Sequence, residues 1–572
     1  MTHDTALAMA RFVQSLGTLA LFGALAFRVL VAPVARGVVW ACLGLALLGG
    51  AAWAGLAAAG YGVPASALLG GTGFGRWLLL RLGLLAMAAG LAQWRPWLAA
   101  VVAGLGVAAA VASSHAAAEA DPLSMAVLAL HVLAAGLWLG GLLPLWQQAG
   151  AAAMGPARRF GLWAGIAVAV LLATATVQGL RGIVDLPGLF GTPYGQAGLV
   201  KAGLLLGLLA LAGMNRFVAV PAGRVRLLRL GIGLEILLGL GVLAAATVMG
   251  SSMPSWHDTP VWPFAWAPST IALEEPELHD EVFDALHALL GAFALLLLAA
   301  LARRVRWVAL IAAGVIAGFA LPHLDILLVP AVPTSFQHSP TGFSATGIAA
   351  AAKLYPGQCA SCHGARGEGD GPLAGQMALP PADLTAPHLW DHPDGALYWM
   401  IAEGSRTADG RVGMPGLGRQ LAAARIWELI DYIRARNAAV AVEADGNFDR
   451  PTPAPELQLQ CADGSTPTLS IWRKQAGALV VRRGAPVASD LPVVFLHPGP
   501  PVAGGCVAPD PTAWAGYAAM TAGGAALPDD GWFVIDANGW LRRRGQGSAD
   551  AAWQSIRRDP LSSEITPLPH QH

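Results

Sequence analysis

The chain has 572 residues, of which 55% are hydrophobic and only 12% are charged, and its 35 basic and 35 acidic side chains cancel. A soluble globular domain carries about 25% charged residues, so this composition excludes a wholly soluble protein. Because Lys and Arg fall mostly in short loops and form no patch, the sequence also argues against nucleic acid as a partner.

Long Ala, Leu, Gly and Val stretches fill residues 1–330 and predict helices that cross a membrane. A spanning helix needs roughly 17–25 apolar residues. The candidate segments are 5–27, 38–60, 77–92, 97–117, 125–146, 161–181, 198–214, 230–250, 282–301 and 307–328. The third segment is the shortest. The predicted fold class is therefore mainly α, with a polytopic helical membrane bundle of about ten spans.

Arginine sets the orientation of these spans, because cytoplasmic loops are enriched in positive charge. One set of alternate loops contains Arg28, Arg36, Arg95, Arg158, Arg159, Arg216, Arg224, Arg226, Arg229, Arg303, Arg304 and Arg306. The other set holds little beyond Arg76, Arg181 and Lys201. We expect a multi-pass protein in a bacterial inner membrane, with the lipid bilayer as its partner and with both termini in the periplasm. The first span lacks a basic n-region and a cleavage site, so we expect it to be retained.

Shifts in composition divide the chain into segments. We expect a membrane domain at 1–252, a periplasmic loop with two further helices at 253–330, a linker at 331–344, a soluble domain at 345–440 and a final region at 456–560. Pro333 and Pro340 predict that the linker is an extended tether.

Residues 359–363 read Cys-Ala-Ser-Cys-His, the C-x-x-C-H signature of covalent haem attachment. Cys359 and Cys362 would add to the two haem vinyl groups as thioethers, and the adjacent His363 would reach the iron as its proximal ligand. A disulfide or a thioredoxin-type redox pair is the alternative, and the neighbouring histidine disfavours it. The motif predicts one covalent haem c.

The second axial ligand of the iron should come from downstream. Met414, in Val-Gly-Met-Pro-Gly, is the best candidate, because a thioether stabilises ferrous iron and Pro415 fixes the backbone beside it. Met377 and Met400 are competitors. Met400 follows two aromatic residues in an apparent helix, where packing is the simpler role.

The surrounding segment resembles class I cytochrome c over about 90 residues. The residues that carry this resemblance are Tyr355, Gly364, Gly369, Asp370, Gly371, Pro372, Pro380, Pro381, Ala382, Asp383, Leu384, Trp427 and Tyr432. An amphipathic helix is predicted at 421–436, with Ile426, Ile430 and Ile433 as its apolar stripe. The resemblance implies an all-α cytochrome c domain with haem on the periplasmic side, and a periplasmic electron donor or acceptor as a partner.

Histidines and methionines gather at the predicted periplasmic side of the membrane segment. They are His115, His131, His257, His279, His287 and His323, together with Met249 and Met253. Thioether with imidazole suits Cu(I), and imidazole with carboxylate suits Cu(II), so the group is a candidate copper site. Singly, each histidine could instead bond a neighbouring helix, and each methionine could pack or face lipid.

Three further alternatives remain open in this region. Met249, Met253 and His257 would share a helical face if the eighth span continued, although Gly250 and Pro254 favour a loop. Two histidines, such as His131 with His115 or His287, could ligate haem b. Arg81 and Glu235 lie within or near predicted spans, where an interior ion pair or a water-lined role is one alternative; for Glu235 we expect instead that it extends to the interface.

The membrane segment resembles the copper-resistance protein D (CopD) family over roughly residues 5–250. The residues concerned are His131, Trp138, Gly140, Gly141, Thr192, Tyr194, Gly195, Lys201, Asn215, Arg216, Phe217, Arg229 and Glu235. The resemblance implies an eight-helix core that handles copper ions at the periplasm or transports them across the inner membrane.

The final region, 456–560, predicts a small α/β domain. Residues 492–496 read as a strand, and 532–542 as a hairpin turning at Asn538-Gly539. The hairpin weakly resembles the end of a thioredoxin-like fold, but a C-x-x-C is lacking. Cys461 and Cys506 could pair in an oxidising periplasm, whereas Cys42 should be a small core residue.

Together these patterns favour an inner-membrane copper-handling or copper transport protein with haem c for one-electron transfer, with cupric reductase activity as one use of the electron. The alternative is a membrane-anchored respiratory cytochrome c, with haem b or quinol in the membrane domain.

Overall fold

The computed structural model describes residues 2–113, 121–148, 154–183, 185–269, 276–302, 304–442, 446–484, 491–501, 505–521, 524 and 526–549. They form two compact units, Met1–Val261 and Trp262–His572, which are described separately. The candidate ligand His115 and the end of the 456–560 region lie outside the described residues.

Nine helices among the described residues are long and apolar enough to cross a membrane. They are α1 (His3–Leu30), α2 (Arg36–Tyr61), α4 (Gly73–Leu91), α7 (Pro122–Gln147), α8 (Met154–Gly182), α10 (Pro193–Met214), α11 (Val225–Met249), α12 (Pro276–Leu301) and α13 (Arg306–Ala320). In α13 the apolar stretch continues through the 3-10 turn η5 (Leu321–Leu327). The predicted mainly α membrane fold is confirmed.

The sequence predicted that the third span would be the shortest, but in the structure the fourth span is shorter. The third forms the 19-residue helix α4. The fourth forms α5 (Pro96–Ala108), a 13-residue helix that gives way to the 3-10 turn η1 (Ala109–Ser113). Pro96 fixes where α5 begins, and 13 residues of α-helix cover only about 20 Å, less than a bilayer core.

The first unit is a helical bundle held together by small residues. A side-chain carbon at Gly23 would lie 2.4 Å from the carbonyl oxygen of Gly136, and one at Gly17 would lie 2.3 Å from the backbone nitrogen of Ala46. Glycine at these points therefore lets α1 approach α7 and α2 closely, as is typical of membrane helices. The bundle has one apolar cluster on α1, α2, α4 and α5, and another on α1, α7, α8, α10 and α11.

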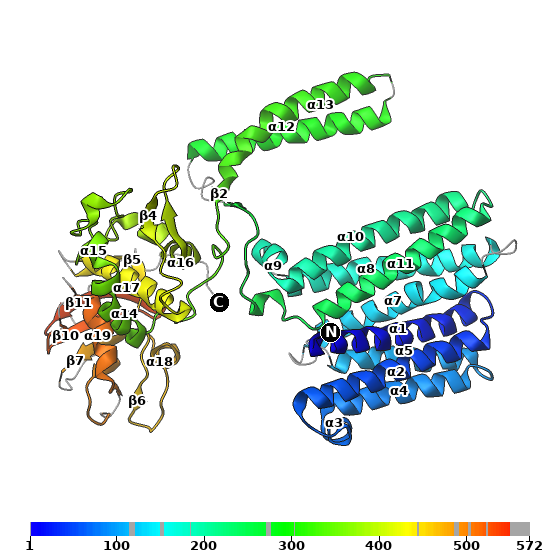
Figure 1. Ribbon diagram of the computed structural model, residues 1–572, viewed down its shortest axis with the longest axis horizontal. Helices are drawn as coiled ribbons and strands as arrows, with labels where there is room; N and C mark the ends of the chain where they lie inside the picture. Colours follow the sequence, from blue (N-terminus) through cyan, green and yellow to red (C-terminus); the bar gives the residue numbers. More distant parts are fainter. Residues whose placement is uncertain are drawn as a thin grey trace. The chain divides into compact units, whose positions relative to one another are not determined.

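Short helices mark one end of this bundle. Figure 1 shows α3 (Ala65–Gly71), α9 (Leu186–Gly191) and the N-terminus at the same end. The arginine-bearing connections, α1 to α2, α4 to α5 and α10 to α11, lie at the other end. The helices thus alternate in direction, as the charge pattern requires.

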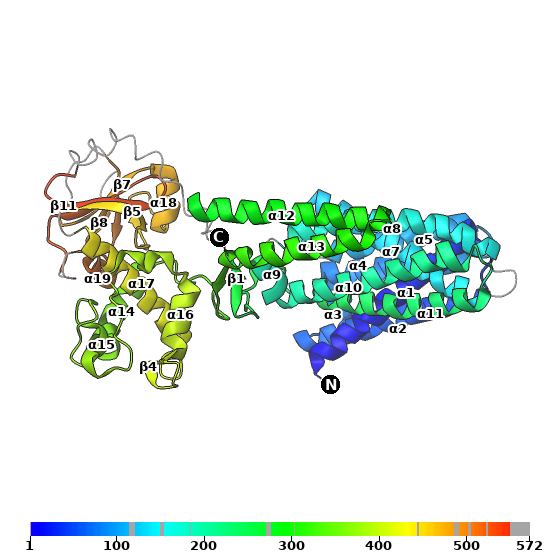
Figure 2. The same ribbon diagram turned by 90° about the horizontal axis from the view of Figure 1, so that it is seen from above.

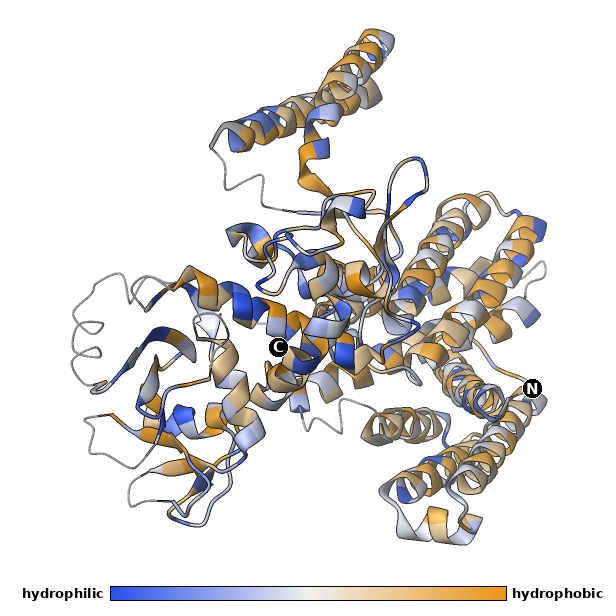
Figure 3. Cartoon of the chain, turned by 60° about the vertical axis from the view of Figure 1, so that its left-hand side comes forward, coloured by the Kyte–Doolittle hydropathy of each residue, from blue (hydrophilic) through white to orange (hydrophobic). Residues whose placement is uncertain are grey.

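The second unit begins with a helical hairpin of α12 and α13. Strand β1 (Trp266–Pro268) pairs antiparallel with β2 (Leu328–Pro330) at its base. Figure 3 shows apolar residues along both helices, as membrane contact requires.

A helical domain (345–441) follows. Its helices are α14 (Ala345–Gln358), α15 (Ala360–His363), η6 (Ala374–Gln376), η7 (Pro387–Asp391), α16 (Asp394–Glu403) and α17 (Ala423–Ala441). Its strands β3 (Gly404–Arg406) and β4 (Val412–Pro415) form a small antiparallel hairpin. The predicted apolar stripe of Ile426, Ile430 and Ile433 is buried against Tyr355 and Ile401, which confirms the amphipathic helix.

The last part is a sheet domain (446–549). Its strands are β5 (Asn447–Pro453), β6 (Gln460–Cys461), β7 (Leu479–Arg483), β8 (Val493–Leu496), β9 (Cys506–Ala508), β10 (Gly531–Ile535) and β11 (Trp540–Gln546), and its helices are α18 (Leu469–Ala476) and α19 (Pro511–Ala519). The sheet order is β5-β11-β10-β7-β8-β9-β6, with β7, β8 and β9 parallel. The predicted hairpin is β10–β11, and Gly539 in its turn has φ +96°.

The helical and sheet domains share one core. Ala345 and Ile348 of α14 pack in the same apolar cluster as Ala435 of α17 and Val481 and Phe533 of the sheet. Figure 2 shows α17 and α19 next to the strands of the sheet. Gly516 of α19 touches α14, since a side-chain carbon there would lie 2.1 Å from the Ala345 carbonyl oxygen. The two domains therefore form one packed body.

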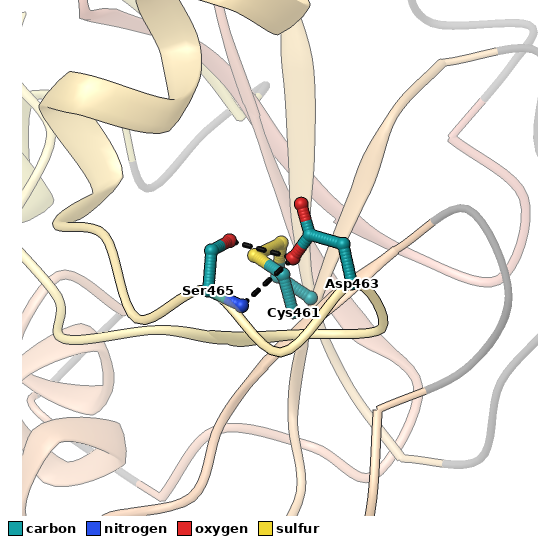
Figure 4. Close-up of a disulfide and its surroundings, with 4 residues drawn as sticks. Cys461, Asp463 and Ser465 are labelled. Carbon is teal, nitrogen blue, oxygen red and sulfur yellow. Dashed lines mark hydrogen bonds between the residues drawn. A yellow bond between two sulfur atoms is a disulfide. The ribbon is translucent and has the colours of Figure 1, made fainter.

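The predicted pairing of Cys461 with Cys506 is confirmed. The disulfide joins β6 to β9 at directly opposed positions. Beside it, Asp463 Oδ1 accepts hydrogen bonds from the backbone nitrogen (2.9 Å) and the hydroxyl (2.6 Å) of Ser465 (Figure 4). Both sulfurs are buried among apolar residues, which suits a structural disulfide. Cys42 is also buried, as predicted for a core residue.

Candidate haem site and membrane cavities

The attachment motif lies where two helices meet. Cys359 directly follows α14, and Cys362 and His363 belong to the short helix α15. The following loop folds back on α15, because the backbone nitrogens of Gly369 and Gly371 donate to the carbonyls of His363 (2.9 Å) and Cys362 (3.0 Å). A side-chain carbon at Gly371 would lie 2.5 Å from the Ser361 carbonyl oxygen, so this close return requires glycine.

The His363 imidazole is oriented by the backbone. Its Nδ1 lies 2.9 Å from the carbonyl oxygen of Ala382, and a carbonyl can only accept, so Nδ1 carries the proton. The other ring nitrogen, Nε2, then presents its lone pair, which is the form of histidine that binds iron. Ala382 belongs to the Pro-Pro-Ala-Asp-Leu segment, whose role the sequence did not reveal.

The two motif cysteines are half-buried thiols and not a disulfide. Burial, with a smaller contribution from the neighbouring Cys362, raises the pKa of Cys359 to about 11. A thioredoxin-type redox cysteine has a lowered pKa, so this environment argues against that alternative. It suits a thioether, which carries no charge.

Met414 is placed on β4, opposite Ser405 of β3. Its half-buried side chain packs against the same apolar cluster as Cys359. The preceding Gly413 is tightly enclosed, since a side-chain carbon there would lie 2.6 Å from Leu379 Cδ1. Of the competitors, Met400 is 46% exposed on α16 and Met377 follows η6. Two thiols, an oriented imidazole and a half-buried thioether in one small domain fit haem c.

The linker is not the extended tether that its prolines predicted. Thr334 Oγ1 donates to the Gly395 carbonyl (2.5 Å), and Ser339 Oγ donates to the buried Asp431 carboxylate (3.3 Å), as does Thr341. Close by, Arg434 pairs with Asp394 at 2.7 Å. A buried carboxylate needs hydrogen-bond donors, and the linker supplies them.

Stability of the helical domain should depend on pH through Asp431. Burial, reinforced by the Asp394 carboxylate, raises the pKa of Asp431 to about 7, against the pull of the Thr341 hydrogen bond. Because the folded pKa exceeds the unfolded one, this stabilisation is complete below about pH 4 and is lost as pH rises through about 7. Asp431→Asn should remove that dependence and raise the free energy of unfolding at pH 8 by about 2 kcal/mol. Chemical denaturation from pH 4 to 8 measures this, and identical pH profiles for both proteins would contradict it.

The structure disperses most of the candidate copper ligands. Met253 and His257 lie in the loop after α11, so the loop alternative holds and no common helical face forms. His279 and His287 lie on α12, on either side of Phe283. His323 Nδ1 lies 2.6 Å from Glu281 Oε1. Within the described ranges, no three His, Cys, Asp or Glu side chains gather as a metal would require.

His131 and Met249 are brought together in one cavity. The cavity has a volume of about 350 Å³ and lies between α7, α8, α10 and α11. We call it the outer cavity. His131 Nδ1 lies 2.9 Å from Thr174 Oγ1, and the Thr174 hydroxyl itself donates to the Val170 carbonyl (2.7 Å). Thr174 therefore orients the imidazole, a role with no signal in the sequence. Lys201 lines the same cavity, and its positive charge opposes a bare cation there.

A second, inner cavity of about 590 Å³ lies between the other halves of the same four helices. Glu235 lines it and is only 4% exposed, so its expected extension to the interface is wrong. Its Oε1 instead accepts a hydrogen bond from Asn215 Nδ2 at 2.7 Å. The burial arises because Gly231, one turn earlier on α11, leaves room for the amide: a side-chain carbon there would lie 2.2 Å from Asn215 Oδ1.

Two segments of the chain match known families. Residues 154–249, from α8 to α11, match the family model of copper resistance protein D. Residues 346–433, from α14 into α17, match that of cytochrome C oxidase, cbb3-type, subunit III. The chain joins a CopD-type segment to a cytochrome c domain. The helical domain carries the cytochrome match, which confirms that resemblance. The CopD resemblance, expected over roughly residues 5–250, is confirmed over 154–249.

A curated relative carries part of this pattern. The copper transport protein CutJ of Bacillus subtilis (strain 168) is 32% identical over 178 residues, which are 29% of this chain and 32% of that protein. The match thus spans about a third of the relative's length. No solved structure matches the chain.

Proposed function

We propose that the protein handles copper in the bacterial inner membrane and carries a covalent haem c at the periplasmic face. The observation that carries the copper part is the outer cavity, which is lined by both an imidazole, His131, and a thioether, Met249. The similarity of residues 154–249 to copper resistance protein D, and of the chain to CutJ, supports the same function.

Haem c would supply one-electron exchange between ferric and ferrous iron. Cys359 and Cys362 would hold the porphyrin covalently, His363 would ligate the iron through Nε2, and Met414 would provide the thioether. Reduction of Cu(II) to Cu(I) consumes one electron, and a periplasmic one-electron donor would supply it. Arginine in alternate loops supports the inner-membrane location and the periplasmic termini.

His131 and Met249 are the proposed copper ligands. Soft thioether and imidazole donors favour Cu(I) among biological metals. Met253, His257, His279, His287 and His323 stay predictions as ligands on exposed segments, where they could collect copper before it enters the cavity.

Copper affinity tests this assignment. His131→Ala should weaken Cu(I) binding to the purified full chain by at least about 100-fold, because it removes a ligand in a cavity that offers two. Lys201→Leu should strengthen binding about tenfold, because it removes a like charge from the same low-dielectric space without adding a ligand. Competition with a Cu(I) chelator measures both.

The exposed His388, in the cytochrome c domain, provides the matched control, and His388→Ala should leave the affinity unchanged. Copper affinities equal in the wild type and in the His131→Ala variant would refute the proposed site.

Membrane-anchored respiratory electron transfer is the second candidate, favoured by the match of residues 346–433 to an oxidase subunit. It requires haem b or quinol in the membrane domain. A haemochrome spectrum of the purified chain decides: haem b in addition to haem c supports this candidate, and haem c alone with bound copper supports the first.

A further inference from the structure

Two cavities lie end to end along one set of four helices. The outer cavity is lined by the first part of α7 and the last part of α11, including His131 and Met249. The inner cavity is lined by the last part of α7 and the first part of α11, including Trp138 and Glu235. On α8 the last part lines the outer cavity and the first part lines the inner one, whereas on α10 the first part lines the outer cavity and the last part lines the inner one.

A short apolar septum separates the cavities. On α7 the two linings adjoin, because Trp138 lines the inner cavity and Leu139 lines the outer one. On the other three helices the nearest lining residues are seven to nine positions apart, from Val168 to Val177 on α8, Lys201 to Leu209 on α10 and Glu235 to Val242 on α11. At 1.5 Å per residue, this is about 10–14 Å, well under half of the bilayer core.

The septum consists of Leu171, Leu208 and Gly239, with Leu139 packed on Gly239. Leu171 and Leu208 are buried in the same apolar cluster, and Leu208 is only 1% exposed. A side-chain carbon at Gly239 would lie 3.0 Å from Leu139 Cδ2, so the two residues are tightly packed. These four residues are apolar, and water would not wet them. Thr174, the buried polar residue between Val168 and Val177, has its hydroxyl engaged by the Val170 carbonyl and by His131.

The inner cavity contains a buried polar pair, Asn215 and Glu235, in which one acceptor atom has no hydrogen-bond donor. Asn215 Oδ1 is buried and has no hydrogen-bond partner, and Glu235 pairs with none of the described cations. Asn215 opens the π-helical turn η2 (Asn215–Ala219), a distortion often found at functional sites. The guanidinium groups of Arg158 and Arg216 also line this cavity and oppose a cation in it, as Lys201 does in the outer cavity. The buried amide oxygen without a donor, next to a carboxylate, nevertheless favours a cation or a donor between them.

We propose that copper crosses the membrane between α7, α8, α10 and α11. The septum limits its passage, and Glu235 and Asn215 form the binding site on the inner side. This inference rests on the proposed copper function and adds the route to it. His131 and Met249 receive the ion on one side of the septum, and the oxygen donors accept it on the other. The cluster on α1, α2, α4 and α5 takes no part in the route.

Copper flux into proteoliposomes containing the full chain tests the route. Leu208→Ala opens the septum and should raise flux at least about threefold, since an apolar constriction limits passage. Gly239→Leu overfills the septum and should lower it about tenfold. Glu235→Gln keeps the acceptor for Asn215 but removes the charge, and it too should lower flux about tenfold.

Leu85→Ala is the matched control, because Leu85 is equally buried but belongs to the other cluster. Its flux should equal that of the wild type, and size-exclusion profiles establish that each variant is folded. The route is wrong if the wild type binds copper but Leu208→Ala changes flux no more than Leu85→Ala does. It is also wrong if Glu235→Gln transports at the wild-type rate. Failure of the wild type to bind copper at all would instead refute the proposed function.

Discussion

Replacing Cys359 and Cys362 with alanine should abolish covalent haem attachment while the membrane domain stays intact. The two sulfurs are the only half-buried thiols in the cytochrome c domain as the structure describes it, and they lie beside the oriented His363. Thioether bonds survive denaturation, whereas axial ligation does not. Haem-linked peroxidase staining of a denaturing gel, after expression with an intact maturation system, measures the loss.

Cys42 provides the matched control. It is the other free cysteine among the described residues, it is buried in α2, and Cys42→Ala should retain full staining. Staining that persists in the Cys359→Ala/Cys362→Ala variant would show that the attachment site has been misassigned.

Met414→His should lower the reduction potential of the haem by on the order of 0.1–0.3 V, because imidazole stabilises ferric iron better than a thioether does. The effect is expected to be large because Met414 packs in the same cluster as Cys359 and is held by the β3–β4 hairpin. A redox titration followed by visible absorption measures the potential on the purified full chain.

Met400→Leu is the comparison for this substitution. Its side chain is partly exposed on α16, so the potential should shift by less than about 0.03 V. A large shift in the Met400→Leu protein and none in the Met414→His protein would assign the axial ligand to Met400.

Local patterns accounted for most of the fold and for the grouping of the candidate haem-binding residues. Cys359, Cys362 and His363 are adjacent in sequence, so their grouping needs no tertiary information. The helices follow from apolar runs whose length a bilayer dictates, and the β10–β11 hairpin follows from Asn538-Gly539. The helix of the fourth span is shorter than the sequence predicted, and the position of Pro96 decides where this helix begins.

Long-range packing decided what the sequence could not predict. The burial of Glu235 depends on Gly231 leaving space for Asn215, and the orientation of His131 depends on Thr174, 43 residues away. Likewise, the linker is held by Asp431, about 90 residues downstream. No local periodicity reports such pairs, because each residue alone is equally compatible with the interface or with solvent.

Combined haem and metal analysis of one purified sample tests the central claim most directly. The account predicts one haem c per chain, copper that is retained through chromatography, and no haem b. A chain that carries haem b and no copper, or that carries no covalent haem after expression with an intact maturation system, would contradict it.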